Sequence, residues 1–508
     1  MRLHDLLAGL DVLELTGGDV EVTSVTNDSR RVRPGALYAC IPGARVDGHD
    51  FAAAAVGAGA RALLVERRID LSGLDGRTFD ARTFDSSAVA QARVPLVRAA
   101  LGPASSALFG HPSRAMRCLG VTGTNGKTTT TFLLEAIARA AGARVGVIGT
   151  VGARIDGTTI PTPQVTPTTP EAPDLQQLLA EMRDAGVDVV AMEVSSHGLA
   201  RREVDGTTFA AVCFTNLSHD HLDYHGTLDA YRAAKLRLFD GSFAPAAAVN
   251  VDDDTGRGLV SRLEARSAPV WTFGLGPDAR VTARDVEHRA DGTSFALVDR
   301  DDGAAVAVRM PLVGPFNLSN ALAAAATARA AGLPLDAVAG GLDAAAVVPG
   351  RMEPVVQGQP FTVLVDYAHT PDALVHVLRA ARALAGPRRV LAVFGAGGDR
   401  DREKRPLMGA AVGAGADVAF VTSDNPRSEA PETIAAEIRA GLRDASASVV
   451  VELDRRTAIH VALAAAEPGD VVVVAGKGHE TGQTIGAETR PFDDRQVARE
   501  ELEALGWR

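Results

Sequence analysis

The residues best suited to chemistry stand in one glycine-rich stretch, residues 120–131, which reads GVTGTNGKTTTT. Gly123 and Gly126 allow the backbone to turn so that several N–H groups face a single anion. Lys127 can reach the outer phosphates of a nucleotide, and the hydroxyl of Thr128 can ligate Mg²⁺. The stretch therefore predicts a site for a nucleoside triphosphate.

The elements on either side of this stretch are those that a phosphate loop needs. An apolar run ending at Val121 predicts a strand before it, and residues 132–141 (FLLEAIARAA) predict a helix after it. The N-terminus of that helix adds partial positive charge where phosphates would lie. Val121 departs from the general pattern, which has glycine there. The alternative is an ordinary glycine turn, and the Gly-Lys-Thr-Thr sequence argues against it.

Polar side chains follow three later apolar runs. Residues 187–192 lead to Glu193, residues 210–214 lead into TNLSHDH with His221, and residues 246–249 lead into NVDD. In an open parallel sheet, ligands lie beyond the carboxyl ends of the strands. Glu193 and His221 are therefore candidates for holding Mg²⁺, with oxygen ligands dominant. Each alone is also consistent with a helix cap or a satisfied polar group.

Bulk properties limit the classes of protein. A chain of 508 residues is too long for one core, so we expect about three domains. The net charge of −11 argues against nonspecific nucleic-acid binding. The three cysteines show no pairing or metal-ligand spacing, which fits a reducing, cytoplasmic location. Because no apolar run reaches about eighteen residues, we expect no membrane span, and the N-terminus does not read as a signal peptide.

The order of expected strands and helices predicts an α/β protein of three domains. A small N-terminal α/β domain covers 1–104, and a central doubly wound sheet with the phosphate loop covers 105–346. A C-terminal Rossmann-like sheet covers 347–508, after a linker, VVPGR, that ends at Arg351. Its turn GAGGDR lacks the spacing of a dinucleotide fingerprint, so we expect no dinucleotide site.

Three further features stay open from the residues alone. Lys235, on an expected helix, is most simply a solvated surface residue. Asn317 and Asn320 share one face of a helix that opens with GPFNLSNA, and they either cap it or also touch nucleotide. The loops at 28–30 and 43–49 are either ligand loops or plain surface turns.

Together these motifs resemble the Mur ligases, the ATP-dependent amide-forming enzymes of peptidoglycan precursor synthesis. In family order, along essentially the whole chain, stand GTNGKTT, EVSSHGL, FTNLSHDHLDYHG, NVDD, GPFNLSNALAA, PGRME, DYAHTPDAL, GGDRDREKRPLM, DNPR and GKGHE. Within the family, DYAHTP, GGDRDREKRPLM and DNPR are similar to the members that add meso-2,6-diaminopimelate to UDP-N-acetylmuramoyl-L-alanyl-D-glutamate. The resemblance implies ATP as a substrate, Mg²⁺ as cofactor, no nucleic-acid or membrane partner, and a monomer.

The resemblance also implies roles for individual residues. Catalysis is assigned to Lys127, Lys235, His221 and Glu193, and metal binding to Thr128, Glu193, His221 and Lys235. ATP is held by Gly123, Thr124, Asn125, Gly126, Lys127, Thr128, Thr129, Asn317 and Arg351. The UDP-sugar-peptide is held by Asn27, Ser29, Gly43, Ala44, Arg45, Val46, Thr168, Thr169, Ser195 and Arg201. The incoming amino acid is held by Arg400, Asp424, Asn425, Pro426, Arg427, Gly476 and Glu480.

One match replaces an earlier interpretation, and two positions depart from the family. Lys235 matches the family's carbamylated lysine, in which CO₂ converts an amine into a metal-binding carboxylate. Pro167 stands where family members often have asparagine. The family's substrate arginine falls at Glu203, which cannot act in the same way, so Arg201 or Arg202 must take that role.

The implied reaction forms an amide through an acyl phosphate. A substrate carboxylate attacks the γ-phosphate of ATP, and an amine then displaces phosphate. Arg427 can pair with the second carboxylate of diaminopimelate, which lysine lacks, and Arg400 can take a carboxylate as well. Domain closure about residues 347–351 would bring ATP and amino acid together.

Three alternatives compete with this hypothesis. A lysine-adding Mur ligase is disfavoured by DNPR, and a folylpolyglutamate-type synthetase is disfavoured by the first domain with its NDSR sequence. A P-loop ATPase of a motor or regulatory kind would hydrolyse ATP in response to a macromolecule and would need no amino acid.

Overall fold

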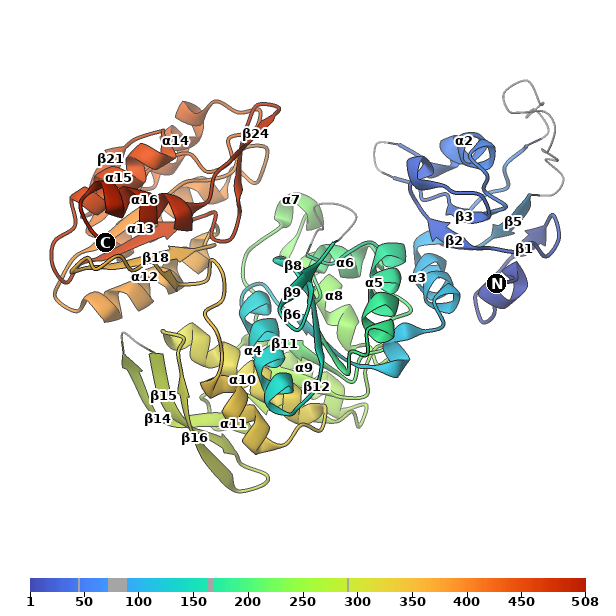
Figure 1. Cartoon of the computed structure of the whole chain (residues 1–508), viewed down its shortest axis with the longest axis horizontal. Helices are drawn as coiled ribbons and strands as arrows, with labels where there is room; N and C mark the ends of the chain where they lie inside the picture. The colour runs from blue at the N-terminus through green and yellow to red at the C-terminus, as the bar shows by residue number, and fades with distance from the viewer. Residues whose placement is uncertain (44–45, 72–88, 162–167, 290–291) are drawn as a thin grey trace. The chain divides into compact units, whose positions relative to one another are not determined.

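The computed structural model describes residues 1–43, 46–71, 89–161, 168–289 and 292–508 (Figure 1). These residues form two compact units, each assembled from discontinuous segments. The first unit contains Met1–Thr122, Gly142–Val212 and Ala234–Ala247, and the second contains Gly123–Ala141, Cys213–Ala233 and Ala248–Arg508. Of the residues singled out in the sequence, Ala44, Arg45 and Pro167 lie outside the described residues.

The N-terminal part of the first unit is a mainly parallel sheet with strand order β1-β5-β4-β3-β2, in which only the β1–β5 pair is antiparallel. The apolar runs ALYA and ALLV form β3 and β4, in which every residue is buried. Leu3, Leu37, Leu64 and Leu101 lie in the core beneath the sheet. The strands are β1 (Glu14–Thr16), β2 (Ser24–Thr26), β3 (Ala36–Ala39), β4 (Ala62–Val65) and β5 (Ala90–Arg93).

Helices and short 3₁₀ turns connect and cover these strands. They are α1 (Leu3–Leu6), η1 (Ser29–Arg31), η2 (Gly48–Phe51), α2 (Ala52–Gly57) and α3 (Val97–Leu108). The boundary predicted at residue 104 therefore falls inside α3, whose buried Val97, Ala100 and Ala104 belong to the N-terminal core. The domain bounds stay predictions.

The rest of the first unit contains the strand that precedes the phosphate loop. Strand β10 pairs in parallel with β6 on one side and β7 on the other, and β8 and β9 continue from β7 as an antiparallel meander. The elements are η4 (Pro112–Ala115), β6 (Arg117–Thr122), β7 (Val145–Gly149), β8 (Gly152–Ile155), β9 (Thr158–Ile160), α5 (Ala172–Asp184), β10 (Val189–Glu193) and α6 (Ser196–Ala200). The predicted strands before the loop and before Glu193 are confirmed.

Three elements continue from one unit into the other: β11 (Ala211–Phe214), α8 (Leu228–Leu236) and β12 (Ala247–Asn250). In the second unit, the helix predicted after the phosphate loop is α4 (Lys127–Ala140), which packs against α10 (Pro315–Ala330) and α11 (Leu335–Asp343). Strands β14, β15 and β16 form an antiparallel meander that extends the sheet from β13, with which β14 pairs in parallel. The remaining elements here are α7 (Leu222–His225), η5 (Arg237–Phe239, first unit), α9 (Asp254–Glu264), β13 (Val270–Phe273), β14 (Val281–Arg289), β15 (Gly292–Asp299) and β16 (Ala304–Met310).

The C-terminal part of the second unit is the predicted Rossmann-like sheet, with strand order β17-β18-β22-β19-β20-β21. All pairs are parallel except β17–β18. One core holds side chains of α12, α13 and α14, and a second holds side chains of α15 and α16, so helices cover both faces (Figure 1). This arrangement confirms a doubly wound α/β domain.

The bounds of this domain's elements are as follows. The strands are β17 (Glu353–Pro354), β18 (Thr362–Asp366), β19 (Val390–Phe394), β20 (Val418–Val421), β21 (Ser448–Val451), β22 (Val471–Ala475), β23 (Gly482–Ile485) and β24 (Glu488–Pro491). The helices are α12 (Pro371–Ala385), α13 (Lys404–Gly415), α14 (Pro431–Ala440), α15 (Arg455–Ala464) and α16 (Asp494–Ala504). None of the helices described in either unit is both long and apolar enough to cross a membrane.

Candidate active site

The phosphate loop begins the second unit, and its two glycines have backbone conformations that other residues rarely adopt. The φ angles are 152° at Gly123 and 90° at Gly126. A Cβ atom at Gly123 would collide with Oγ1 of Thr215, and one at Gly126 would collide with Oδ1 of Asn320. The residue types are therefore fixed by close approach as well as by conformation.

Lys127 is the first residue of α4 and folds back over the loop. Its Nζ donates hydrogen bonds to the carbonyl oxygens of Gly123 (3.0 Å) and Thr124 (2.9 Å). Asn216, which follows β11, also contacts the loop, because its Oδ1 accepts a hydrogen bond from the amide N–H of Asn125 (2.9 Å). The lysine ammonium thus lies where the loop would enclose an anion.

Side chains of α12 and of the linker also reach the phosphate loop within the second unit. Nδ2 of Asn125 donates to the Asp372 carboxylate (2.9 Å), and Nη2 of Arg351 donates to Oγ1 of Thr128 (3.1 Å). The Arg351 guanidinium lies over the ring of Tyr367, 4.7 Å from its centroid. The structure therefore brings Arg351 to the predicted ATP residues.

The two asparagines of α10 lie at different distances along the chain of contacts to the phosphate loop, and Asn320 is the one that touches it. Asn317 is buried, donates to the carbonyl of Val313 (2.9 Å) and accepts from Nδ2 of Asn320 (3.2 Å). Asn320 is the one that lies against Gly126. The ATP set named only Asn317, although the helical spacing of the two asparagines already placed Asn320 on the same face. Thr129, also in that set, is buried on α4.

A cluster in the first unit gathers three other predicted residues around Glu193, which is 1% exposed. Its carboxylate accepts from the amide of Thr150 (2.9 Å) and from Oγ1 of the same residue (3.0 Å). Oγ1 of Thr150 also hydrogen-bonds Oγ1 of Thr168 (3.1 Å). Thr169 donates to the Glu193 carbonyl (3.1 Å) and accepts from the amide of Ser195 (2.9 Å). Backbone and hydroxyl donors therefore hold the carboxylate in one orientation.

Two further predicted metal ligands are Lys235, on α8, and His221, directly before α7. Lys235 is on α8 as predicted but is 1% exposed, so interpreting it as a solvated surface residue was wrong. His221, before α7, has a φ of 54°, and its backbone N–H donates to the Asp220 carboxylate (2.9 Å). Burial acts to raise the pKa of Asp220, but the charges of His221, His369 and Lys404 lower it overall. The described residues contain no group of three or more His, Cys, Asp or Glu able to hold a metal.

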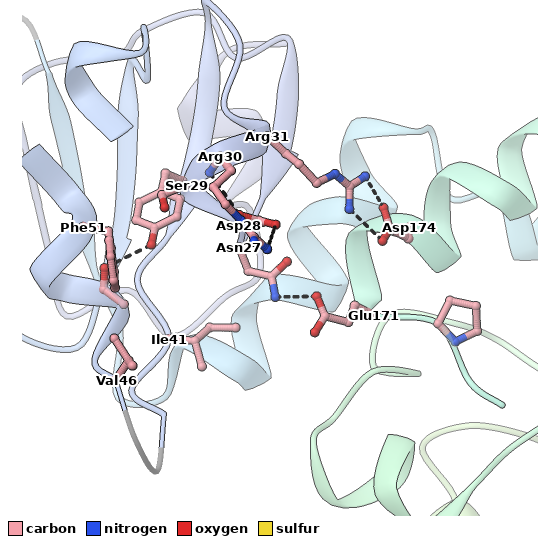
Figure 2. A pocket seen from close by; sticks show the side chains of 13 residues that line it. Asn27, Asp28, Ser29, Arg30, Arg31, Ile41, Val46, Phe51, Glu171 and Asp174 are labelled. Atoms are coloured by element: carbon pink, nitrogen blue, oxygen red, sulfur yellow. Dashed lines mark hydrogen bonds and ion pairs between the residues drawn. The ribbon is translucent and has the colours of Figure 1, made fainter. Parts of the chain in front are cut away.

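A pocket of about 630 Å³ lies in the first unit between the N-terminal sheet and the start of α5 (Figure 2). Nδ2 of Asn27 donates to the Glu171 carboxylate (2.7 Å), and Arg31 forms a two-bonded ion pair with Asp174 (2.9 and 2.6 Å). The ring of Phe51 is 40% exposed. The pocket is lined by Asn27, Asp28, Ser29, Arg30, Arg31, Tyr38, Ile41, Val46, Gly48, Phe51, Pro170, Glu171 and Asp174.

Three predicted uridine residues, Asn27, Ser29 and Val46, therefore line one pocket. Gly43 is close by in the chain, and its N–H donates to the Val46 carbonyl (3.0 Å). Sequence reasoning missed Glu171 as a lining residue, although it directly follows Thr169-Pro170 in the sequence.

The position where the family's substrate arginine falls has a structural role here. Glu203 is 5% exposed and accepts from the amide of Ala172 (2.8 Å), at the start of α5. Burial raises the pKa of Glu203 to about 7. Arg202 pairs with Asp205 (3.1 Å), while Arg201 is exposed at the end of α6. The choice of Arg201 for the substrate stays a prediction.

The predicted amino-acid residues gather where β19, β20 and β22 end. Nδ2 of Asn425 donates to the Glu480 carboxylate (2.9 Å). Lys477, fully buried, donates both to Glu480 (3.1 Å) and to Oδ1 of Asn425 (3.2 Å). A Cβ atom at Gly476 would lie 2.6 Å from the Asp424 carboxylate. Lys477 was missed, although the GKGHE motif that contains it had been noted.

Two arginines flank the glycine turn after β19. Arg427, with a φ of 52°, donates from Nη1 to the carbonyl of Gly398 (2.7 Å). A Cβ atom at Gly397 would lie 3.0 Å from Nη1 of Arg427 and 3.7 Å from Cγ of Arg400. Both guanidinium-bearing side chains therefore stand at the carboxyl edge of the sheet, where ligands of this fold bind.

Comparison with known proteins agrees along the length of the chain. The family models described as Mur ligase family, catalytic domain, Mur ligase middle domain, and Mur ligase, glutamate ligase domain match residues 21–106, 121–328 and 350–478. The UDP-N-acetylmuramoyl-L-alanyl-D-glutamate–2,6-diaminopimelate ligase of Solibacter usitatus is 44% identical over 490 residues, 96% of this chain and 94% of that protein. The enzyme of the same name from Geobacillus thermodenitrificans is 42% identical over 507 residues, 98% of this chain and 99% of that protein.

Solved structures give the same picture. A structure of a UDP-N-acetylmuramoyl-L-alanyl-D-glutamate–2,6-diaminopimelate ligase matches with a TM-score of 0.65 and 33% identity, covering 95% of both chains. MurF from Acinetobacter baumannii matches with a TM-score of 0.62 and 20% identity, covering 99% of this chain and 97% of that one. The likeness to MurF is a likeness of fold.

Proposed function

The chain belongs to the Mur ligase family, and we propose that it joins meso-2,6-diaminopimelate to UDP-N-acetylmuramoyl-L-alanyl-D-glutamate. Family membership makes it an ATP-dependent amide-forming ligase of peptidoglycan synthesis. The observation that most supports this amino acid is the grouping of Arg400, Arg427 and Glu480 at one edge of the C-terminal sheet. Two cations and one anion complement a substrate that carries two carboxylates and, besides the amine that reacts, one further ammonium group.

ATP binds at the phosphate loop in this proposal. Lys127 exchanges its hydrogen bonds to the loop carbonyls for bonds to the β- and γ-phosphate oxygens. The backbone N–H groups of Gly123–Thr129 supply further donors, and Arg351 supplies a second cation beside Thr128. Asn317 acts by orienting Asn320, which lies against the loop.

Mg²⁺ is the implied cofactor, and the proposed donors suit it chemically. The buried Glu193 carboxylate, the Thr128 hydroxyl and a carbamylated Lys235 would offer the hard oxygen donors that Mg²⁺ prefers, and His221 would add a borderline nitrogen donor. When bound, the ion neutralises charge on the phosphoryl oxygens. Burial of Lys235 supports carbamylation, because a carbamate converts a cation that is costly to bury into a ligand for a metal.

The proposed reaction follows from the chemistry of these groups and from family membership. The carboxylate of the D-glutamyl residue attacks the γ-phosphorus, forming an acyl phosphate and releasing ADP. The amine of diaminopimelate then attacks the acyl carbon, and inorganic phosphate leaves. The chain's residues contribute mainly by holding two anions together and orienting the amine.

The first-unit pocket is the proposed site for the UDP end of the other substrate. Its volume of about 630 Å³ lies within the usual range for small-molecule sites. Asn27, Ser29 and residues 43–46 are proposed to contact the uridine. Thr168, Thr169, Ser195 and Arg201 are proposed to contact the sugar and peptide. Pro170 and Glu171 line the pocket and directly follow the two threonines, which supports one continuous site.

Selection of the amino acid is assigned to the C-terminal sheet. Arg427 and Arg400 take the carboxylates of diaminopimelate, and Glu480, with Asp424, Asn425, Pro426 and Gly476 around it, takes an ammonium group. Lysine has no carboxylate at its far end, so it would leave one arginine unpaired in a closed site. That costs on the order of 1–3 kcal/mol or more.

An amino-acid panel tests the proposal. The full chain, with ATP, Mg²⁺ and UDP-N-acetylmuramoyl-L-alanyl-D-glutamate, is assayed for phosphate release and product mass with diaminopimelate, lysine and no amino acid. We expect product only with diaminopimelate. A lysine adduct of equal rate would identify a lysine-adding ligase, and hydrolysis independent of any amino acid would identify a different kind of P-loop ATPase. A monomer and a cytoplasmic location stay predictions.

A further inference from the structure

A fully buried arginine, Arg405, lies behind the proposed amino-acid site; it stands in the GGDRDREKRPLM motif, but no role was assigned to it there. It stands on α13 with 0% of its side chain exposed. Its two terminal nitrogens donate to both carboxylate oxygens of Glu429 (2.7 and 3.0 Å), and Nη1 also donates to Glu437 (2.6 Å). A buried guanidinium is expensive unless it is paired in this way. The Arg405–Glu429 pair is called the clasp below.

The clasp connects two loops that carry proposed substrate residues. The first loop, residues 395–400, follows β19, and the second, residues 424–429, follows β20. Nη2 of Arg405 donates to the Gly397 carbonyl in the first loop (3.2 Å). Glu429, the last residue of the second loop, accepts from the amide of Asp399 in the first (2.7 Å). The arginine lowers the pKa of Glu429 to about 2, so this carboxylate stays charged.

The two loops are in backbone contact. The N–H of Gly398 donates to the carbonyl of Asn425 (2.9 Å), and a Cβ atom at Gly398 would collide with the carbonyl of Pro426. The Asp399 carboxylate accepts from Oγ of Ser428 (2.6 Å). One loop carries Arg400 and the other carries Arg427, so the spacing between these guanidinium groups depends on how the loops are held.

We propose that Arg405 is a positioning residue which, through Glu429, fixes the spacing of Arg400 and Arg427 and thereby selects an amino acid with two carboxylates over lysine. The inference rests on the proposed function. Two guanidinium groups at fixed spacing favour a dicarboxylic substrate, because the cost of orienting them is met during folding rather than on binding. Loosening the clasp weakens diaminopimelate binding and leaves lysine, which engages fewer of these groups, nearly unaffected.

The chain offers a matched control. Glu437, on α14, also pairs with Arg405 (2.6 Å) and with Arg402 (2.5 Å). In the described part of the chain, no hydrogen bond of Glu437 reaches either loop. Glu429→Gln and Glu437→Gln therefore make the same chemical change to the same arginine, and only the first disturbs the contact between the loops.

The experiment measures kcat and KM for diaminopimelate and for lysine, and KM for ATP, with the full chain and both variants. Glu429→Gln is expected to raise KM for diaminopimelate about tenfold and to lower the diaminopimelate-to-lysine ratio of kcat/KM by a similar factor. KM for ATP should change less than about twofold, and Glu437→Gln should leave the ratio at the wild-type value. Arg405→Lys, which keeps the charge but loses the two-bonded geometry, should follow Glu429→Gln.

The inference is overturned if the two glutamine variants shift the ratio equally, or if both lower the melting temperature while the ratio stays at the wild-type value. Either result would give Arg405 a purely structural role. Failure of the proposed function is a separate result, since it is seen in the wild-type chain as an absence of turnover with diaminopimelate.

Discussion

The pocket in the first unit and the amino-acid site in the second hold their polar groups in different ways. In the pocket, the side chains that line it pair with each other across it, as Asn27 does with Glu171 and Arg31 with Asp174. In the amino-acid site, Asn425 and Glu480 also pair with each other, but a buried cation, Lys477, stands behind both and holds them in orientation. A ligand must displace existing bonds in the first case, whereas in the second the binding groups are already oriented.

This difference teaches where specificity is expected to come from. Preoriented groups lose little freedom on binding and penalise a substrate that leaves one of them unpaired. Groups that must first break a bond to a neighbour contribute only the difference between two hydrogen bonds. The amino-acid site should therefore be the more sensitive to single substitutions.

The largest effect is expected for Arg427→Ala. Loss of a guanidinium that pairs with a carboxylate should raise KM for diaminopimelate by about 10- to 100-fold, while KM for ATP and for the UDP-linked substrate stays nearly unchanged. Steady-state kinetics with each substrate varied in turn measures this, with Arg439→Ala on the exposed side of α14 as control. An unchanged KM for diaminopimelate would remove Arg427 from the site.

A smaller effect is expected for Asn27→Ala. The amide contributes a hydrogen bond to uridine only in exchange for its bond to Glu171, so KM for the UDP-linked substrate should rise about three- to tenfold. KM for diaminopimelate should not change. Arg427→Ala and Asn27→Ala serve as controls for each other, and an effect of Asn27→Ala as large as that of Arg427→Ala would contradict the contrast between the sites.

Glu171→Ala should act in the opposite direction. Without its partner at 2.7 Å, the Asn27 amide no longer has a bond to break, so KM for the UDP-linked substrate should fall about two- to threefold. Isothermal titration with that substrate measures the same change as a lower Kd. A raised Kd would mean that Glu171 itself contacts the ligand and that the pairing across the pocket is part of the bound state.

The smallest effect concerns the buried acid that anchors α5, the helix beside the pocket. Burial raises the pKa of Glu203 from 4.5 to about 7, so the folded chain keeps a proton that the unfolded chain loses between these values. The unfolding free energy should therefore fall as pH rises from about 4.5 to about 7. Glu203→Gln removes this dependence and keeps an acceptor for the amide of Ala172.

Calorimetry at pH 5 and pH 8 checks this expectation. The melting temperature of Glu203→Gln relative to the wild type should be higher at pH 8 than at pH 5 by a few degrees, on the order of 2–4 °C per kcal/mol. Glu181→Gln, at an exposed position on α5, should show no such difference. If the melting temperatures of the wild type and of Glu203→Gln differed by the same amount at pH 5 and at pH 8, Glu203 would be ionised over that whole range.

Much of the fold could be predicted because it depends on local pattern. The strand before the phosphate loop, the helix after it, and the strands ending at Glu193 and Asp366 follow from runs of apolar residues bounded by turns. The candidate residues were found by motif, and the structure groups Asn27 with Ser29, Thr168 with Glu193, and Asn425 with Glu480. Glycines and charged residues at fixed spacing carry that information in the sequence itself.

The sequence by itself determined the family, the phosphate loop and the residues able to meet anions. Only the tertiary structure decided which charged residues are buried. From the residues alone Lys235 was expected at the surface, Lys477 and Arg405 were given no role within their motifs, and Glu203 was named only as unable to replace a substrate arginine, yet all four are at most 5% exposed. The reason is physical. Burial of a charge depends on which distant segments pack around it and supply its partners, and the local spacing of apolar residues gives no information about such distant segments.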